Sequence, residues 1–337
     1  MKRLIIRILA SGLLTASAQA QRVDLSWPTP NPAWAAGKPI SAFLQDTGTG
    51  DPASGSFGGV RTNGRQFHEG LDIKALKRDS RGEPADPVFA AMDGVVRYVN
   101  SVAGNSSYGR YIVMEHPAQS PAVYTLYAHL AKIEPGIRPD VVVRQGQTIA
   151  LMGRSASGYA IPKQRAHVHF EIGLYLSRNF QSWYNWKKFG SRNEHGVYNG
   201  MNLMGIDPLD FFNAHRARRI NNVRDYFNQL SPVVKLRIAT RQRPDFVDRY
   251  PGLVTKHPPM LIAGWEIEFS WTGLPYRWTP LDSTDVKGMR TNEVKILSVD
   301  EKADARDKSK RLAISRRGQW VMTDDLQTVM QLLFGLR

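Results

Sequence analysis

The chain contains no cysteine. This absence excludes a disulfide framework, a zinc site built from thiolates and a lipid anchor on an N-terminal cysteine. The protein must therefore be stabilised by its own hydrophobic core. A length of 337 residues with 42% hydrophobic residues permits such a core and has room for two domains or one large one.

Long apolar runs are also missing. The strongest one, residues 8–16, is well short of the roughly 20 residues that a membrane-spanning helix needs. It follows the basic residues Lys2, Arg3 and Arg7 and precedes the small-residue pattern of Ala18 and Ala20. We interpret residues 1–20 as a secretory signal peptide and not as a membrane anchor. The chain is therefore expected to be exported, to the periplasm or the extracellular space, without a stable membrane anchor.

Acidic residues are outnumbered, and the formal net charge is +15. Residues 21–213 contain 20 basic and 16 acidic residues, whereas residues 214–337 contain 22 and 14. In an exported chain nucleic acid is a poor partner, and the basic C-terminal part could instead hold acidic envelope polymers or anionic lipid headgroups. The alternative is a basic surface that only contacts solvent.

The composition divides the mature chain into three parts. Residues 21–55 are rich in Pro, Gly, Ala and Ser and predict an extended N-terminal segment. Residues 56–213 contain short runs of β-branched and aromatic residues bounded by Gly, Pro or Asn, with an Asn63-Gly64 hairpin signal and no long helix between 56 and 176. We expect a mostly antiparallel β domain there.

Residues 214–337 predict a smaller α+β or β-rich domain. A helix is expected at 222–230, and residues 265–271 alternate so that Trp265, Ile267, Phe269 and Trp271 share one face of a strand. Residues 301–311 are expected to form a charged loop. Thr323 is placed to cap a final helix.

Two histidines, His167 and His169, occur in the sequence AHVHFE. Residues i and i+2 of a strand point to the same face, about 6–7 Å apart. One imidazole could bind a metal while its neighbour approaches a water molecule near that metal. A polar pair that faces solvent is the alternative.

A second pair, His68 and Asp72, occurs in FHEGLDI. Nitrogen and carboxylate oxygen are both good zinc ligands, and Gly70 allows the chain to bend closely between them. With His169 they would provide three protein ligands, which is the number in a catalytic zinc site. Taken alone, the pair could equally be a capping or loop contact.

His129 ends the apolar run of LYAHL. A single histidine in such a strand is usually a hydrogen-bonded core residue. A metallohydrolase also needs groups that take a proton from water and stabilise the developing oxyanion, and the glutamate of an HExxH motif is absent. His129 and His167 are therefore the candidates for these roles.

Taken together, HEGLD, LYAHL and HVHFE, in this order within 67–171, resemble the motifs of the lysostaphin/LytM-type zinc endopeptidases. The resemblance covers about 110 residues closely. It implies a two-sheet antiparallel β domain, known as the duplicated hybrid motif. It also implies cleavage of peptidoglycan stem peptides.

By this resemblance, one Zn²⁺ per chain is bound by His68, Asp72 and His169, and His129 and His167 are the catalytic histidines. A zinc-bound water would attack the peptide carbonyl. Two departures concern the rim of the cleft. Residues 163–165 (Lys-Gln-Arg) replace the usual Thr-Gly-Pro-type approach to the HxH motif, and residues 76–86 look like an insertion that could rim the same cleft.

Two other functions have to be considered. A non-catalytic envelope module of the same fold would bind or activate a cell-wall hydrolase, but such modules lack zinc ligands, which this chain retains. A sugar-phosphotransferase component shares the fold and its paired histidines, but its cytoplasmic phosphate donors are incompatible with export. The favoured prediction is an exported zinc endopeptidase.

Overall fold

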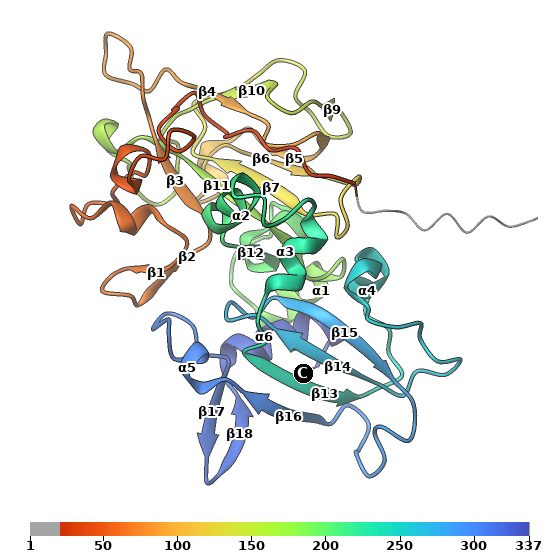
Figure 1. Cartoon of the computed structure of the whole chain (residues 1–337). Coiled ribbons are helices and arrows are strands. Elements are labelled where there is room, and N and C mark those ends of the chain that lie inside the picture. The colour runs from red at the N-terminus through yellow and green to blue at the C-terminus, as the bar shows by residue number, and fades with distance from the viewer. Residues whose placement is uncertain (1–20, 337) are drawn as a thin grey trace, which may run out of the picture.

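The computed structural model of the protein describes residues 21–336 (Figure 1). The predicted signal peptide, residues 1–20, lies outside the described residues. No helix in the described part of the chain is long and apolar enough to cross a membrane. Strands predominate, which confirms the mostly β fold expected from the sequence.

The first part of the chain contains two main sheets. The larger one has the order β12-β11-β7-β6-β5-β9, and β3 pairs with β11 beside this path. The smaller one has the order β4-β10-β8. Every pairing in both sheets is antiparallel. The strands of the larger sheet are β3 (Leu71–Lys74), β5 (Gly94–Asn100), β6 (Tyr111–Glu115), β7 (Tyr124–Ala128), β9 (Val142–Val143), β11 (His167–Tyr175) and β12 (Leu203–Ile206). Those of the smaller are β4 (Pro87–Phe89), β8 (Lys132–Ile133) and β10 (Thr148–Leu151).

Strand β11 shows how the sequence separates core from site. Its residues alternate between two faces, as in any strand. Val168, Phe170 and Ile172 point into the main hydrophobic core, whereas His167 and His169 point to the opposite face. Strand β11 lies between β7 on one edge and β3 and β12 on the other, and all of its residues are buried.

The predicted hairpin is present. Strands β1 (Gly58–Arg61) and β2 (Gln66–His68) pair antiparallel. The turn between them contains three residues with positive φ, Thr62, Asn63 and Gly64. Asn and Gly are the residues that adopt this backbone conformation at least cost.

Residues 21–55 are packed on the domain that follows them. They contain two short 3₁₀ helices, Ile40–Ala42 and Pro52–Gly55. The ring of Trp27 stacks on Trp34 with centroids 5.0 Å apart and meets the edge of Phe212 at 5.3 Å. This segment therefore packs on Phe212, a core residue of the domain.

Three helices follow β11 and lie between the two halves of the molecule (Figure 1). They are α1 (Phe180–Lys187), α2 (Pro208–Arg216) and α3 (Val223–Gln229). The predicted helix at 222–230 is α3, with Asn222 accepting a hydrogen bond from the Asp225 N–H as its cap. Asp207 caps α2 in the same way.

The C-terminal part is β-rich with several helices. A four-stranded antiparallel sheet has the order β15-β14-β13-β16, and a two-stranded hairpin follows it. The sheet consists of β13 (Val234–Ala239), β14 (Gly264–Phe269), β15 (Pro275–Leu281) and β16 (Val294–Val299). The hairpin consists of β17 (Ala313–Arg316) and β18 (Gln319–Met322). The helices of the C-terminal part are α4 (Asp245–Arg249), α5 (Glu301–Asp304) and α6 (Asp324–Phe334).

Some details of this part differ from the sequence predictions. Trp271 lies beyond β14, and its ring packs against Phe57 and Phe67 and not beside Trp265. Thr323 stands at the N-cap of α6, but its hydroxyl donates to the Arg311 carbonyl and makes no helix cap. The expected charged loop begins as helix α5 because Asp300 caps it.

Candidate active site

Four separate strands bring the five candidate residues together. His68 ends β2, Asp72 lies in β3, His129 directly follows β7, and His167 and His169 lie in β11. The ligand atoms of His68, Asp72 and His169 lie within 4.8 Å of one another. In detail, His68 Nε2, Asp72 Oδ1 and His169 Nδ1 are mutually 3.0 Å apart.

Gly70 makes this convergence possible. Strands β3 and β11 place Asp72 directly opposite His169. A Cβ at position 70 would lie 2.3 Å from the Phe170 carbonyl oxygen, a distance that real contacts do not show. The glycine therefore allows β3 to approach β11, a role beyond the close bend that the sequence predicted for it.

Each imidazole of the triad is oriented by a hydrogen bond from its other nitrogen. His68 donates from Nδ1 to the Ser56 carbonyl at 2.7 Å. His169 donates from Nε2 to Glu171 Oε1 at 2.9 Å. Glu171 in turn accepts hydrogen bonds from the hydroxyls of Tyr108 and Tyr124. These bonds fix the tautomers, so that a lone pair of each imidazole points toward Asp72.

This arrangement fits a cation. Two lone-pair nitrogens and a carboxylate oxygen repel one another at 3.0 Å unless a proton or a metal ion lies between them. Burial opposes a charge on His169, but hydrogen bonds with Asp72 and Glu171 outweigh it and raise the His169 pKa to about 9. Two nitrogens and one oxygen are also a donor set that zinc accepts.

His129 and His167 lie beside the triad. Their ring centroids are 4.8 Å apart, and His167 Nε2 is 3.4 Å from Asp72 Oδ1. His129 donates from Nδ1 to the Ser155 carbonyl, and His167 donates from Nδ1 to the Arg165 carbonyl. Nε2 of each ring is thus left for other partners.

The backbone and the charge of His129 are both unusual. Its φ of 60° is a left-handed conformation that few residues other than glycine adopt, and such residues cluster at functional sites. Burial, together with the neighbouring His167 and His169, holds the His129 pKa well below its usual range. Burial also lowers the pKa of His167. Neutral imidazoles can accept a proton at neutral pH.

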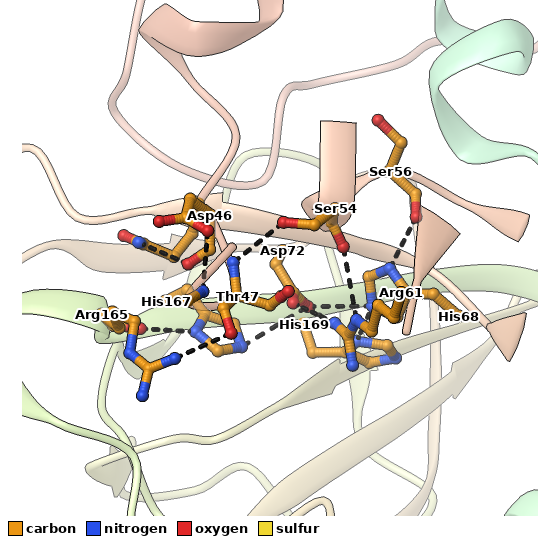
Figure 2. Close-up of polar contacts among 12 residues, drawn as sticks. Asp46, Thr47, Ser54, Ser56, Arg61, His68, Asp72, Arg165, His167 and His169 are labelled. Carbon is orange, nitrogen blue, oxygen red and sulfur yellow. Dashed lines mark hydrogen bonds and ion pairs between the residues drawn. The ribbon is translucent and has the colours of Figure 1, made fainter. Parts of the chain in front are cut away.

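These side chains border a cavity of about 860 Å³. Arg61 of β1 lies on one side of the triad and Arg165 on the other (Figure 2). The Arg61 guanidinium pairs with Asp72 Oδ2. Residues 46–56 join the two sides, because Arg165 donates to the Thr47 carbonyl and Arg61 to the Ser54 carbonyl.

The sequence analysis missed Arg61 and Tyr108. Arg61 lies in the segment that was interpreted only as a hairpin, and nothing in its local pattern places it against Asp72. Tyr108 lies in an irregular loop before β6. A polar partner for the HxH histidine could have been expected, because metal-binding histidines usually donate their second N–H.

Two further features lie outside the metal group. His116 is fully buried and bonded to the Asp93 carbonyl and the Thr125 hydroxyl, away from the cavity. The insertion at residues 76–86 contacts the rim loop, because Arg78 donates to the carbonyls of Lys163 and Gln164. Its Asp79, Arg81 and Glu83 line a neighbouring cavity and not the one with the histidines. The segment therefore contacts the loop at the rim of the metal-site cavity, and its own cavity shares Tyr159 and Ala160 with it.

Comparison with known proteins supports one family. Residues 66–180 match the model of peptidase family M23. A search of curated proteins finds no match.

Similar solved structures include the catalytic domain of the prophage-encoded M23 protein EnpA from Enterococcus faecalis, with 19% identity, coverage of 39% of this chain and 80% of that one, and a TM-score of 0.28. A zinc-containing peptidase from Vibrio cholerae is 24% identical, and the match covers 45% of this chain and 37% of that one with a TM-score of 0.30. The catalytic domain of lysostaphin from Staphylococcus simulans is 17% identical, and the match covers 52% of this chain and 95% of that one with a TM-score of 0.31.

The family match contains all five converging residues, from His68 to His169, and the ligand atoms of His68, Asp72 and His169 meet within it. Residues 66–180 therefore match a domain of peptidase family M23, and they contain an intact His-Asp-His group with the arrangement of metal ligands.

Proposed function

We propose that the chain is an exported zinc endopeptidase that hydrolyses peptide cross-links of peptidoglycan. The observation that carries this proposal is the convergence of the three candidate ligands and two further histidines on one cavity, within a region that matches a peptidase family. The signal-like N-terminal sequence supports export.

In this proposal His68, Asp72 and His169 hold the zinc ion. Three protein ligands leave a position open for water or substrate. When bound there, zinc supplies a Lewis acid for the peptide carbonyl and lowers the pKa of a water molecule. Ser56 and Glu171 keep the two imidazoles in the tautomers that a metal requires.

His129 and His167 are proposed to act on the reacting atoms. Their Nε2 atoms are free of the hydrogen bonds that hold Nδ1, so a ring can take a proton from the attacking water. The imidazolium formed in this way can then donate a hydrogen bond to the carbonyl oxygen as it becomes negative. The two rings lie side by side, so both steps can occur at one peptide bond.

The non-catalytic alternative is less well supported, because all five residues are present and oriented. For the rest of the chain we propose the boundaries given above, with 56–213 as the peptidase domain and 214–337 as a basic domain that holds acidic envelope polymers. The excess of basic residues in the latter supports this role.

The test combines metal content with product analysis. The purified protein is assayed for zinc and incubated with peptidoglycan, with and without a chelator. We expect about one zinc per chain. We also expect the protein to release fragments with cleaved cross-links from peptidoglycan, and the chelator to stop this release. Asp72→Ala and His169→Ala should lose both zinc and activity. Hydrolysis by a metal-free variant would contradict the mechanism, and bound zinc without cleavage would contradict the substrate.

A further inference from the structure

The guanidinium of Arg165 lines the cavity without a carboxylate partner. It belongs to the rim loop that precedes β11 by one residue, and it is partly buried. Its hydrogen bond to the Thr47 carbonyl, at 2.7 Å, holds it in place. In the part of the chain that the structure describes, this cation forms no ion pair, in contrast to Arg61, which pairs with Asp72.

Residue 48 is shaped to receive this guanidinium. Gly48 has a φ of 102°, and a Cβ there would lie 2.3 Å from Arg165 Nη1. Glycine adopts this backbone without strain, and a larger residue would require the end of the Arg165 side chain to shift. The position of Arg165 is thus determined by contacts from a segment more than 100 residues away.

None of the carboxylates that line the cavity forms an ion pair with Arg165 in the described residues. Asp46 accepts hydrogen bonds from the N–H groups of Gly48, Thr49 and Gly50, which hold its own loop. Asp72 belongs to the metal group. Glu69 is placed near Lys310 and Glu171. A metal ion would add positive charge, so the cavity favours an anion beside Arg165.

We propose that Arg165 recognises a carboxylate of the peptide substrate close to the bond that is cleaved. This inference rests on the proposed function and specifies its substrate as a carboxylate-bearing peptide and not a neutral one such as a glycine bridge. Arginine presents paired N–H groups that match a carboxylate, and such charge-assisted hydrogen bonds are about twice as strong as neutral ones. The carboxylate belongs either to a side chain or to the C-terminus of the substrate.

The test compares four synthetic cross-linked stem-peptide dimers. They are identical except that the side-chain carboxylate next to the cleaved bond and the nearby C-terminal carboxylate are each either free or amidated. The full-length mature protein, its Arg165→Gln and Arg165→Lys variants, and the control Arg192→Gln are loaded with zinc and compared by KM and kcat. Arg192 is 92% exposed and does not line the cavity, so its replacement changes the net charge alone.

Amidation of the carboxylate that Arg165 recognises should raise the KM of the wild type about tenfold to a hundredfold. The peptide that shows this rise identifies the recognised group as the side-chain or the C-terminal carboxylate. Arg165→Gln should raise the KM for the free-carboxylate peptide by the same factor and abolish the effect of amidation. Arg165→Lys should restore part of the discrimination. Zinc content should be unchanged in all variants.

Two results would overturn the inference while leaving the proposed function intact. One is that the wild type cleaves all four peptides with equal KM. The other is that Arg165→Gln weakens the amidated and free peptides equally. If the zinc-loaded wild type cleaves none of the four, the proposed function itself fails and the inference with it.

Discussion

Glu171 illustrates how a residue that is not itself one of the three candidate ligands can control them. It is 1% exposed and accepts hydrogen bonds from His169 Nε2, Tyr108 and Tyr124. A buried carboxylate with three donors is satisfied, and it keeps His169 in a single tautomer.

Replacement of Glu171 by Gln should therefore weaken zinc binding about tenfold to a hundredfold. The amide keeps the shape of the side chain, but it offers one acceptor oxygen in place of two. Competition with a chromophoric chelator measures the affinity directly. Glu115→Gln is the control, since Glu115 of β6 pairs with Arg97 of β5 and does not line the cavity. Equal affinities in both variants would show that Glu171 has no role in orienting His169.

His116 supplies a pH-dependent contribution to stability that is separate from the site. Burial lowers its pKa to about 4. Since this value lies below the unfolded value of about 6.5, the contribution is complete above pH 6.5 and is lost as the pH falls toward 4. The loss should reach about 3 kcal/mol.

Urea denaturation of the wild type and His116→Asn across this pH range tests the contribution of His116. The variant should be less stable near pH 7, and the difference between the two proteins should narrow toward pH 4. The histidines of the metal group titrate in both proteins and cancel in the difference. A constant difference would show that His116 titrates normally.

At the scale of elements, the pairing of β3 with β11 decides whether the ligands meet. Asp72 and His169 stand opposite each other in this pairing, and Gly70 is the residue that permits it. The site thus depends on backbone contact as much as on the ligand side chains.

Gly70→Ala should push β3 away from β11. Because the added methyl would meet a backbone carbonyl that cannot move aside, we expect a loss of about 1–3 kcal/mol in unfolding free energy and a fall in zinc content. Gly104→Ala is the matched control, since a Cβ there has nothing within 4 Å. Thermal unfolding of both variants measures the loss of stability, and metal analysis measures the fall in zinc content. A fully stable, zinc-loaded Gly70→Ala protein would refute the packing argument.

Local patterns revealed much of the site but not its surroundings. HEGLD, LYAHL and HVHFE each occupy a few consecutive residues, so strand periodicity and ligand chemistry identified their side chains. Arg61 and Arg165 acquire their surroundings from contacts with Ser54 and Thr47, which no local pattern encodes. In the same way, alternation identified the core face of β14 but not the long-range contact that removes Trp271 from it.

At the scale of the whole molecule, the C-terminal part is bonded to the catalytic domain at several places, among them α4 and the loop that follows α5. Arg249 of α4 donates to the carbonyls of Tyr175 and Leu176 at the end of β11 and lies over the Tyr175 ring at 3.9 Å. In the loop after α5, Asp307 accepts a hydrogen bond from the Gly59 N–H of β1 at 2.6 Å. We therefore expect both parts to unfold in one cooperative transition.

Arg249→Ala should lower the unfolding free energy by about 2–4 kcal/mol, because two buried carbonyls lose their donor and an aromatic ring loses its cation. It should also separate unfolding into two steps. Fluorescence and far-UV circular dichroism, followed during denaturation, would then give different midpoints. Arg243→Ala, at a 44% exposed ion pair, is the control. Coincident midpoints with unchanged stability would show that Arg249 does not join the two parts.

The contact of Asp307 with Gly59 affects how freely this peptidase domain could be exchanged among proteins. Phe57 and Phe67 of the hairpin region pack their rings on Trp271, and the Gly59 N–H takes its acceptor from residue 307. A chain cut after residue 213 would expose these rings to water and leave the hairpin that carries Arg61 without its support. In evolutionary and engineering terms, the catalytic domain of this chain is not a self-contained module, and its transfer to another protein would require a substitute for the surface that residues 271 and 307 provide.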